Sequence, residues 1–220
     1  MKFPFLHIFL IVLLLANINM IAEAQNDPKA KTILDGVSAK FKTFKSVQAG
    51  FVFTNEDAKG KVLGTRKGTL YTKGNKYRIT LIGGQDIFCD GVNVWTYDKS
   101  VNEVTISKID PSSNSITPQK LFTNFYDKDF LYKLNGEKKV GAKLVQEIEL
   151  TPVDKTRNFF KVYLLIDKAA KTIYSTKVME KSGTRFTYTV STLNGSVNLP
   201  DAQFVFDAKK YPGVEIIDLR

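Results

Sequence analysis

The spacing of hydrophobic positions divides the chain into a helical beginning and a long region of strands. Asp27 and Pro28 are residue types that favour a helix N-cap and the first helical position. Apolar residues then recur every three or four positions, as on one face of an amphipathic helix ending near Lys45. They are Ala30, Ile33, Leu34, Val37, Phe41 and Phe44. The pattern predicts one helix whose apolar stripe covers another surface.

From Gln48 onward the period changes to two, which is typical of strands with one apolar and one polar face. Phe51 and Phe53 alternate with more polar positions, and the same alternation recurs in residues 76–81 and 185–190. Similar runs occur near residues 64–71, 86–89, 93–97, 103–109, 143–151, 159–166 and 173–180. We therefore expect ten or eleven strands.

Short turn-forming sequences separate these strands. They are Lys73-Gly74-Asn75, Asp90-Gly91, Asp98-Lys99-Ser100, Asn135-Gly136, Asp167-Lys168 and Ser182-Gly183. Links of two or three residues join antiparallel neighbours, because a parallel crossover needs a dozen or more residues. The sequence thus predicts an α+β, mainly β fold, in which a single antiparallel sheet forms one domain with two or three helices.

A loop-like stretch interrupts the predicted strands between Asp110 and Asp129. Thr117 and Pro118 again favour a helix start, so we expect a short helix from Pro118 to near Tyr126. Its apolar side would carry Leu121, Phe122 and Phe125. Periodicity leaves two alternatives open, because the helices could fill the apolar face of the sheet as a packed core or cover it loosely as a lid over a pocket.

The first residues have the composition of a secretory signal peptide. Lys2 precedes an apolar run from Phe3 to Ala16, and the segment ends with Ala22-Glu23-Ala24. The run is shorter than the roughly 20 apolar residues of a membrane span. We expect residues 1–24 to be cleaved, leaving one domain, 25–220, that is exported and soluble. It would carry no lipid anchor, because no cysteine lies near the cleavage site.

Composition limits the chemistry of the mature chain. His7 is the only histidine and lies in the signal peptide, which excludes His-based triads and the usual zinc sites. Cys89 is the only cysteine, so no intramolecular disulfide can form, and a buried small side chain is expected. The sequence has no Gly-x-Ser-x-Gly elbow and no calcium-loop pattern. We expect no enzyme, no metal and no cofactor.

The charge balance is basic, with 32 Lys and Arg against 22 Asp and Glu and a formal net charge of +10. The lysines are scattered over turn positions, and an exported protein is not expected to meet nucleic acid. Anionic lipid headgroups or acidic patches on partner proteins are better targets for such a surface. A generally basic, solvated surface is the alternative.

Several segments, taken in order, resemble one protein family. They are Phe44–Phe51, Gly68–Tyr71, Lys76–Arg78, Asp90–Asp98, Phe204–Asp207 and Pro212–Asp218. Over nearly all of the mature chain, they are similar to the periplasmic outer-membrane lipoprotein carriers, the LolA-like family. The resemblance implies a single unclosed antiparallel β-barrel of about eleven strands, with helices as a lid over a hydrophobic cavity.

The resemblance also implies a function. Family members bind the acyl chains of lipoproteins and shuttle them through the periplasm, from an inner-membrane ABC-type release complex to an outer-membrane acceptor, as monomers. Two alternatives stay open. The chain could be a paralogue that carries another amphiphile, such as a glycolipid or pigment, or senses envelope lipid; or it could be an interaction module with a filled core.

The resemblance assigns the site residues by position. The cavity would be lined by Leu34, Val37, Phe41, Phe51, Phe53, Tyr71, Tyr77, Ile79, Leu81 and Trp95, and the lid would contribute Leu121, Phe122 and Phe125. Many members carry an arginine followed by proline that ties the lid to the barrel. Here that step reads Lys73-Gly74. Lys73 would substitute as a single-point donor to the lid, although a lysine lacks the forked geometry of arginine. Core packing is the alternative role for each apolar residue.

Overall fold

A computed structural model gives the fold of residues 26–110 and 126–220. Its elements are α1 (Pro28–Lys42), β1 (Val47–Glu56), β2 (Val62–Lys73), β3 (Lys76–Leu81), β4 (Asp86–Cys89), β5 (Asn93–Asp98), β6 (Glu103–Lys108), α3 (Tyr126–Asp129), β7 (Phe130–Val140), β8 (Lys143–Pro152), β9 (Phe159–Asp167), β10 (Thr172–Glu180), β11 (Arg185–Asn194), the 3-10 helices η1 (Asp201–Phe204) and η2 (Ala208–Lys210), and β12 (Glu215–Asp218).

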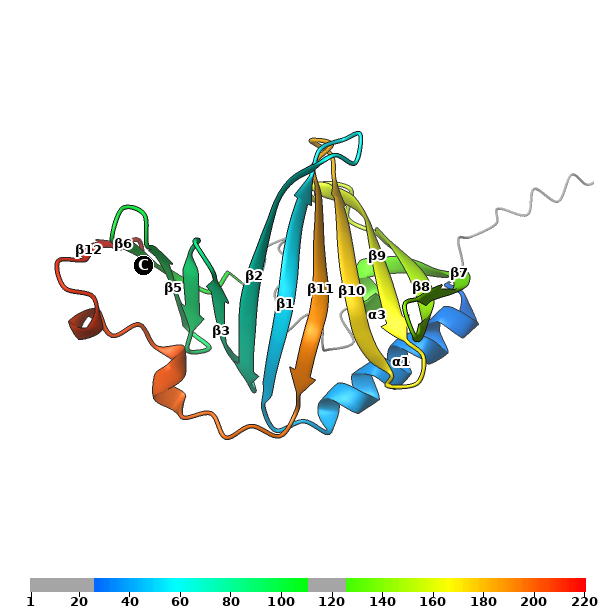
Figure 1. The fold of residues 1–220 in the computed structure, drawn as a ribbon, viewed down its shortest axis with the longest axis horizontal. Coiled ribbons are helices and arrows are strands. Elements are labelled where there is room, and N and C mark those ends of the chain that lie inside the picture. Colours follow the sequence, from blue (N-terminus) through cyan, green and yellow to red (C-terminus); the bar gives the residue numbers. More distant parts are fainter. Residues whose placement is uncertain (1–25, 111–125) are drawn as a thin grey trace, which may run out of the picture.

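The strands form one twelve-stranded sheet in the order β12-β6-β5-β4-β3-β2-β1-β11-β10-β9-β8-β7 (Figure 1). The two edge strands, β12 and β7, are not paired with each other, so the sheet is unclosed. The mainly β, unclosed architecture expected from the sequence is confirmed, with twelve strands in place of about eleven.

Helix α1 begins as the sequence predicts. The Asp27 carboxylate caps it by accepting hydrogen bonds from the backbone N–H groups of Lys29 and Ala30, at 2.8 and 3.4 Å. The same carboxylate accepts the N–H of Leu134 at 3.0 Å, which fixes the start of the helix beside β7. The helix ends at Lys42, three residues earlier than expected, because the chain turns toward β1.

The predicted turns hold with one exception. Asn135-Gly136 is not a hairpin turn but lies inside β7, where the register with β8 shifts between Leu134 and Gly136. The prediction was wrong because a β-bulge and a tight turn can both require a residue with a positive φ, which glycine adopts readily. Gly136 has a φ of 135° within the bulge. The turn between β7 and β8 is at Gly141, with a φ of 59°.

The C-terminal segment corrects the expectation of a fully antiparallel sheet. After β11 the chain passes through η1 and η2 before β12 joins the edge of the sheet (Figure 1). There β12 runs parallel to β6, with Glu215 opposite Glu103 and Ile217 opposite Thr105. A parallel pair is possible here because this connection is long, unlike the tight turns that support the antiparallel prediction. The sequence pattern predicts neither β12 nor β7.

The two faces of the sheet have different covers. We call the face that carries Ala49, Phe51 and Phe53 of β1 the inner face, and the opposite one the outer face. Helix α1 packs on the inner face against β7 and β10. On the outer face of β4 to β6, Phe206 and Tyr211 of the C-terminal segment pack over a separate apolar cluster.

Two expected features fall outside the described residues, namely the signal peptide and the lid helix up to Phe125. Tyr126, expected at the end of that helix, lies in the short helix α3. Within the two described ranges, no helix is both long enough and apolar enough to cross a membrane.

Candidate functional site

Strand register brings apolar residues from four neighbouring strands together on the inner face. Phe51 lies opposite Gly68, which in turn lies opposite Leu81. One row further along, Ala49 pairs with Leu70 and Leu70 with Ile79. Paired residues of adjacent strands point to the same side of a sheet. Five expected site residues therefore share one surface, namely Phe51, Phe53, Tyr77, Ile79 and Leu81.

The exposure of this surface rises from one end to the other. At one end, Val47, Tyr77 and Cys89 are buried. At the opposite end, Phe53 and Leu81 are half-buried, and Tyr188 of β11 is 40% exposed. The aromatic rings there lie close together, with Phe53 to Phe186 at 5.7 Å and Phe53 to Tyr188 at 5.2 Å between centroids. This half of the inner face is an apolar, partly open surface.

The buried end of the surface has no reactive thiol. Cys89 is fully buried, as expected, and burial raises the pKa of its thiol. Burial likewise raises the pKa of the neighbouring Tyr77 hydroxyl to about 12, so both groups are neutral at physiological pH. They contribute shape and apolar surface rather than charge.

A glycine permits the aromatic packing in the middle of the surface. The Phe51 ring lies directly over Gly68, where an added Cβ would overlap it and would also come within 2.7 Å of the Thr80 carbonyl oxygen. A side chain at position 68 would therefore displace the ring. The absence of a side chain is what allows Phe51 to lie flat across β2.

The other half of the inner face is filled by α1. Leu34, Val37 and Phe41, expected in the cavity, are all buried between the helix and β7 to β10. Their neighbours Ile148 and Leu164 are also buried. These three residues hold the helix against the sheet, and they do not belong to the partly open surface.

Polar contacts fix the same helix to α3. The Tyr126 hydroxyl donates a hydrogen bond to the Asp35 carboxylate at 2.9 Å and lies 3.3 Å from the Ser38 hydroxyl. Lys31 forms an ion pair with Asp35 at 3.0 Å and a second one with Asp127 at 3.4 Å. Burial raises the pKa of Tyr126 to about 12, so the hydroxyl keeps its proton and remains a donor. Helix α1 is thus a fixed cover over its half of the sheet.

Two expected site residues lie on the wrong face. Tyr71 pairs with Arg78 and Gln48, and all three point to the outer face. Trp95 pairs with Phe88 and is buried in the outer cluster under the C-terminal segment. The error has a physical cause, because strand alternation defines two faces but does not say which one faces the helix.

Sequence reasoning also missed several residues of the partly open surface. They are Phe44, Leu70, Ile87, Val94, Ile109 and Leu193. The alternation of Phe186, Tyr188 and Val190 was visible in the sequence, but the pairing of β11 with β1 was not. More than a hundred residues separate these two strands in the sequence, and no local pattern encodes such a pairing.

Lys73 has a different role from the expected lid contact. Its ammonium donates hydrogen bonds to the Leu199 carbonyl at 3.0 Å and to the Asp201 carboxylate at 2.9 Å. Lys76 donates to the other oxygen of Asp201 at 2.7 Å. These two hydrogen bonds, with Lys76 first, lower the pKa of Asp201 to about 2. Lys73 therefore fastens the C-terminal segment to the β2–β3 hairpin. The expected lid residues Leu121, Phe122 and Phe125 lie outside the described residues.

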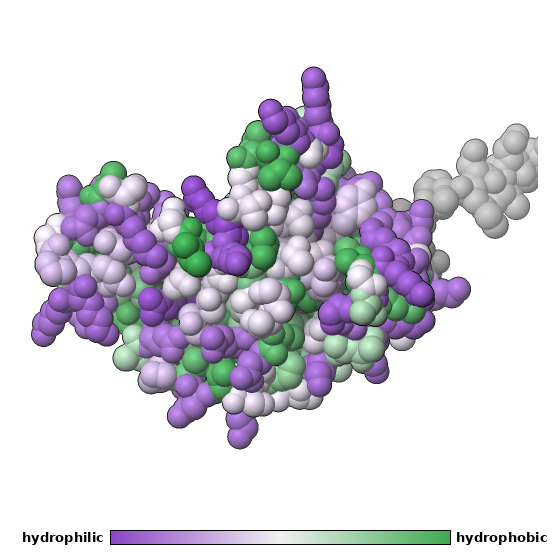
Figure 2. Space-filling model, in the orientation of Figure 1, coloured by the Kyte–Doolittle hydropathy of each residue, from purple (hydrophilic) through white to green (hydrophobic). Residues whose placement is uncertain are grey.

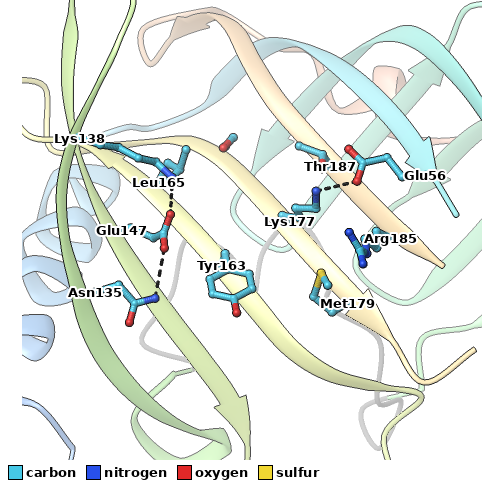
Figure 3. Close-up of a pocket in the computed structure, with 11 residues that line it drawn as sticks. Glu56, Asn135, Lys138, Glu147, Tyr163, Leu165, Lys177, Met179, Arg185 and Thr187 are labelled. Atoms are coloured by element: carbon cyan, nitrogen blue, oxygen red, sulfur yellow. Dashed lines mark hydrogen bonds and ion pairs between the residues drawn. The ribbon is translucent and has the colours of Figure 1, made fainter. Parts of the chain in front are cut away.

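The outer face carries a pocket of about 540 Å³ with a different character (Figure 3). Charged side chains line it in pairs. Glu147 lies between Lys138 and Asn135, and Lys177 donates to Glu56 at 2.6 Å. Its apolar side chains, Tyr163, Leu165 and Met179, lie among these charged pairs. The inner face of β1 to β4 remains the better candidate site for an apolar ligand.

Among residues 26–110 and 126–220, no group of three or more His, Cys, Asp or Glu side chains converges as metal ligands would. The apolar side chains of the inner face of β1 to β4 offer a ligand van der Waals contact and exclusion of water. What this surface can do chemically is hold hydrocarbon.

Comparison with known proteins identifies the family. The profile of the family described as outer membrane lipoprotein carrier protein LolA matches residues 42–207. An outer-membrane lipoprotein carrier protein of Cupriavidus necator is 35% identical over 111 residues, which is 49% of this chain and 51% of the relative. One from Cupriavidus pinatubonensis is 29% identical over 167 residues, covering 72% and 76%. The chain spans about half the length of the first two such relatives it matches.

Solved structures share the fold at low identity. An uncharacterized conserved protein from Thermus thermophilus superposes with a TM-score of 0.58 at 16% identity, over 86% of this chain and 99% of that chain. The lipoprotein LppX of Mycobacterium tuberculosis superposes with a TM-score of 0.50 at 13% identity, over 80% and 100%. At such identities the likeness shows the fold alone. The family profile, in contrast, covers α1's last residue and every strand from β1 to β11. The chain therefore belongs to the outer membrane lipoprotein carrier protein LolA family.

Proposed function

We propose that this protein is a periplasmic carrier that binds the acyl chains of lipoproteins and moves them from the inner to the outer membrane. The observation that carries the proposal is the partly open apolar surface of β1 to β4. Family membership supports it, as do relatives named outer-membrane lipoprotein carrier proteins. In this role the donor is an inner-membrane ABC-type release complex, and an outer-membrane acceptor receives the cargo.

The proposed binding site has its buried end at Tyr77, its centre at Phe51 and Ile79, and its open end at Phe53 and Leu81. Phe44 at the end of α1 borders it and contacts Phe41 edge-on at 5.5 Å. A hydrocarbon chain lying along this surface would remove both itself and these side chains from water. Leu34 and Val37 would contribute indirectly, by holding α1 in place.

Energetics explain why a partly open surface suits a carrier. Burying an acyl chain stabilises it by roughly 0.8 kcal/mol per CH₂, or about 12 kcal/mol for sixteen carbons. A site that captured all of this energy would release its cargo too slowly to act as a shuttle. The half-buried residues Phe53, Ile79 and Leu81 indicate incomplete enclosure, which favours transfer to a tighter acceptor.

The remaining parts of the proposal concern place and chemistry. We infer that residues 1–24 direct export and are removed, so that the mature protein works in the periplasm as a soluble monomer. A carrier needs no catalytic group, and membership of the family supports a non-enzymatic role. The cargo need not be a lipoprotein, since the same apolar surface would accept a glycolipid or another amphiphile.

Analysis of bound molecules tests the cargo directly. The protein is purified from an envelope fraction and co-purifying molecules are identified by mass spectrometry. Recovery of acylated lipoproteins supports the lipoprotein-carrier role. Recovery of a different amphiphile indicates instead a paralogue that carries that molecule. A protein that emerges free of lipid and does not bind a fluorescent fatty acid would refute both.

A matched pair of leucine variants locates the site. Leu81→Asn places an amide on the partly open surface, and it should weaken binding of the fluorescent fatty acid at least fivefold. Leu144→Asn makes the same change at an exposed position in β8, at the other end of the sheet. Equal effects of the two variants would mean that the fatty acid binds elsewhere.

A further inference from the structure

Large hydrophobic side chains are exposed at the end of the sheet where the apolar surface opens. Val62 and Leu63 at the start of β2 are 54% and 60% exposed, and Ile82 after β3 is 72% exposed. The Ile82 N–H donates to the Lys67 carbonyl at 2.9 Å, which places the β3–β4 turn beside β2. The β1–β2 hairpin rises above most of the sheet (Figure 1), and hydrophobic side chains gather on this raised end (Figure 2).

Basic residues flank these hydrophobic ones along the β1–β2 hairpin and strand β2. We call the set of Val62, Leu63 and Ile82, with the cations Lys59, Lys61, Arg66 and Lys67, the hairpin rim. Among the described residues, none of these four cations has an ion-pair partner.

The acids of the same hairpin are already engaged. The Asp57 carboxylate accepts the backbone N–H groups of Lys59 and Lys61, at 2.8 and 2.9 Å. Glu56 of β1 is paired at 2.6 Å with Lys177 of β10, two strands away in the sheet. The hairpin rim therefore presents unpaired positive charge next to exposed apolar side chains.

We propose that the hairpin rim docks this protein on the surface of an anionic phospholipid bilayer. Val62, Leu63 and Ile82 would enter the boundary between headgroups and acyl chains, and Lys59, Lys61, Arg66 and Lys67 would contact lipid phosphates. Apolar tips flanked by Lys and Arg are the chemistry of interfacial binding. Each cation near an anionic surface adds roughly fivefold to the affinity, so four of them make docking both appreciable and salt-sensitive.

The composition of the hairpin rim favours lipid over a protein partner. Protein–protein interfaces are enriched in Tyr, Trp and Met and depleted in Lys, whereas the hairpin rim has aliphatic tips and three lysines. Flexible lysine side chains lose rotamer entropy when a protein surface fixes them in one geometry, but a fluid layer of phosphates does not require this. The charge complementarity is thus with a headgroup layer.

The position of the hairpin rim suggests what docking would achieve, an inference that rests on the proposed carrier function. Ile82 directly follows Leu81, a residue of the open end of the apolar surface, and Arg66 pairs with Phe53 on the inner face. A protein docked by the hairpin rim would hold the open end of its apolar surface at the bilayer. An acyl chain could then pass between the two without crossing bulk water.

Vesicle sedimentation tests the docking without any cargo. The chain from Gln25 to Arg220 is mixed with vesicles of three parts phosphatidylethanolamine to one part phosphatidylglycerol, and with vesicles of phosphatidylcholine alone. We expect binding to the anionic vesicles only, weakened at least tenfold in 0.5 M NaCl because salt screens the phosphates. Binding that is absent, or equal on neutral vesicles, would overturn the proposal.

A matched pair of double variants locates the docking surface. Val62→Ser with Leu63→Ser should weaken binding to the anionic vesicles at least tenfold. Val92→Ser with Leu144→Ser removes exposed hydrophobic side chains at the opposite end of the sheet and should change it less than twofold. If the two double variants lose vesicle affinity equally, the hairpin rim is not the docking surface. If the rim variant binds vesicles normally but fails to transfer cargo between membranes, the hairpin rim contacts a protein partner and the lipid-docking proposal is refuted.

Binding of a fluorescent fatty acid separates this proposal from the carrier function. The Val62→Ser, Leu63→Ser variant should retain fatty-acid binding within twofold, because neither side chain belongs to the apolar surface of β1 to β4. If vesicle docking fails while fatty-acid binding persists, only the docking proposal falls. If the fatty acid does not bind but the vesicles do, only the carrier function falls.

Discussion

Two isoleucine truncations distinguish the filled half of the inner face from the partly open half. Ile148 of β8 is fully buried beneath α1, whereas Ile79 of β3 is half-buried on the apolar surface. The change to alanine removes three carbon atoms in both cases. Any difference between the two variants therefore reflects their surroundings and not the chemistry of the substitution.

The expected magnitudes follow from burial. Three carbons contribute about 2.4 kcal/mol when they are completely buried, and Ile148→Ala also leaves a cavity, so it should destabilise the protein by about 3 to 4 kcal/mol. Ile79 is half-buried and its loss leaves no closed cavity, so Ile79→Ala should cost about 1 kcal/mol. For a domain of this size, these costs correspond to falls in Tm of about 10 and about 3 °C.

Trp95 provides the measurement, because it is the only tryptophan and is buried in the outer cluster away from both isoleucines. Urea unfolding followed by its fluorescence gives the free energy of unfolding, and fatty-acid titration gives the affinity. We expect Ile79→Ala to weaken fatty-acid binding severalfold and Ile148→Ala to leave it nearly unchanged at temperatures where it is folded. If both variants lose several kcal/mol and bind alike, the inner face of β1 to β4 is a closed core and the reasoning fails.

Three further predictions concern contacts outside that pair. Tyr126→Phe removes the hydroxyl that joins α3 to α1 and should cost about 1 to 2 kcal/mol in urea unfolding. Gly68→Ala should displace the Phe51 ring and destabilise by about 1 to 3 kcal/mol, whereas Gly64→Ala, with open space around its Cβ, should be nearly neutral. Because the pKa of Asp201 falls from 3.8 to about 2 on folding, its contact with Lys73 and Lys76 of the β2–β3 hairpin stabilises the protein fully above pH 4 and is lost between pH 4 and 2. The fluorescence of Trp95 should follow that loss, and the Asp201→Asn variant should not show it.

Local patterns were enough to predict most elements of the fold. Asp27 followed by Pro28 identified the helix start because capping involves only the first turn and the residue before it. Glycine-containing turns at Gly74, Gly91 and Gly183 were recognised because each requires a positive φ. Asn135-Gly136 was misassigned for the same reason, since a bulge inside β7 makes that demand as well.

The site was predicted only in part. Five residues, Phe51, Phe53, Tyr77, Ile79 and Leu81, were expected on one surface and lie on one surface. Tyr71 and Trp95, also aromatic and also placed in alternating strands, face the other way. Hydrophobicity indicated burial correctly for Trp95, whose cover is the C-terminal segment. Hydrophobicity could not indicate which of the two covered faces of the sheet buries Trp95.

The sequence by itself determined the helix start, most of the strands and the mainly β class, because each depends on residue types and on neighbours a few positions apart. Only the tertiary structure decided that α1 covers β7 to β10 and leaves the inner face of β1 to β4 partly open. It also decided that Lys73 binds Asp201, far along the chain. These features depend on which strands pair and which side of the sheet each cover occupies, and a period of two in the sequence is the same for both sides.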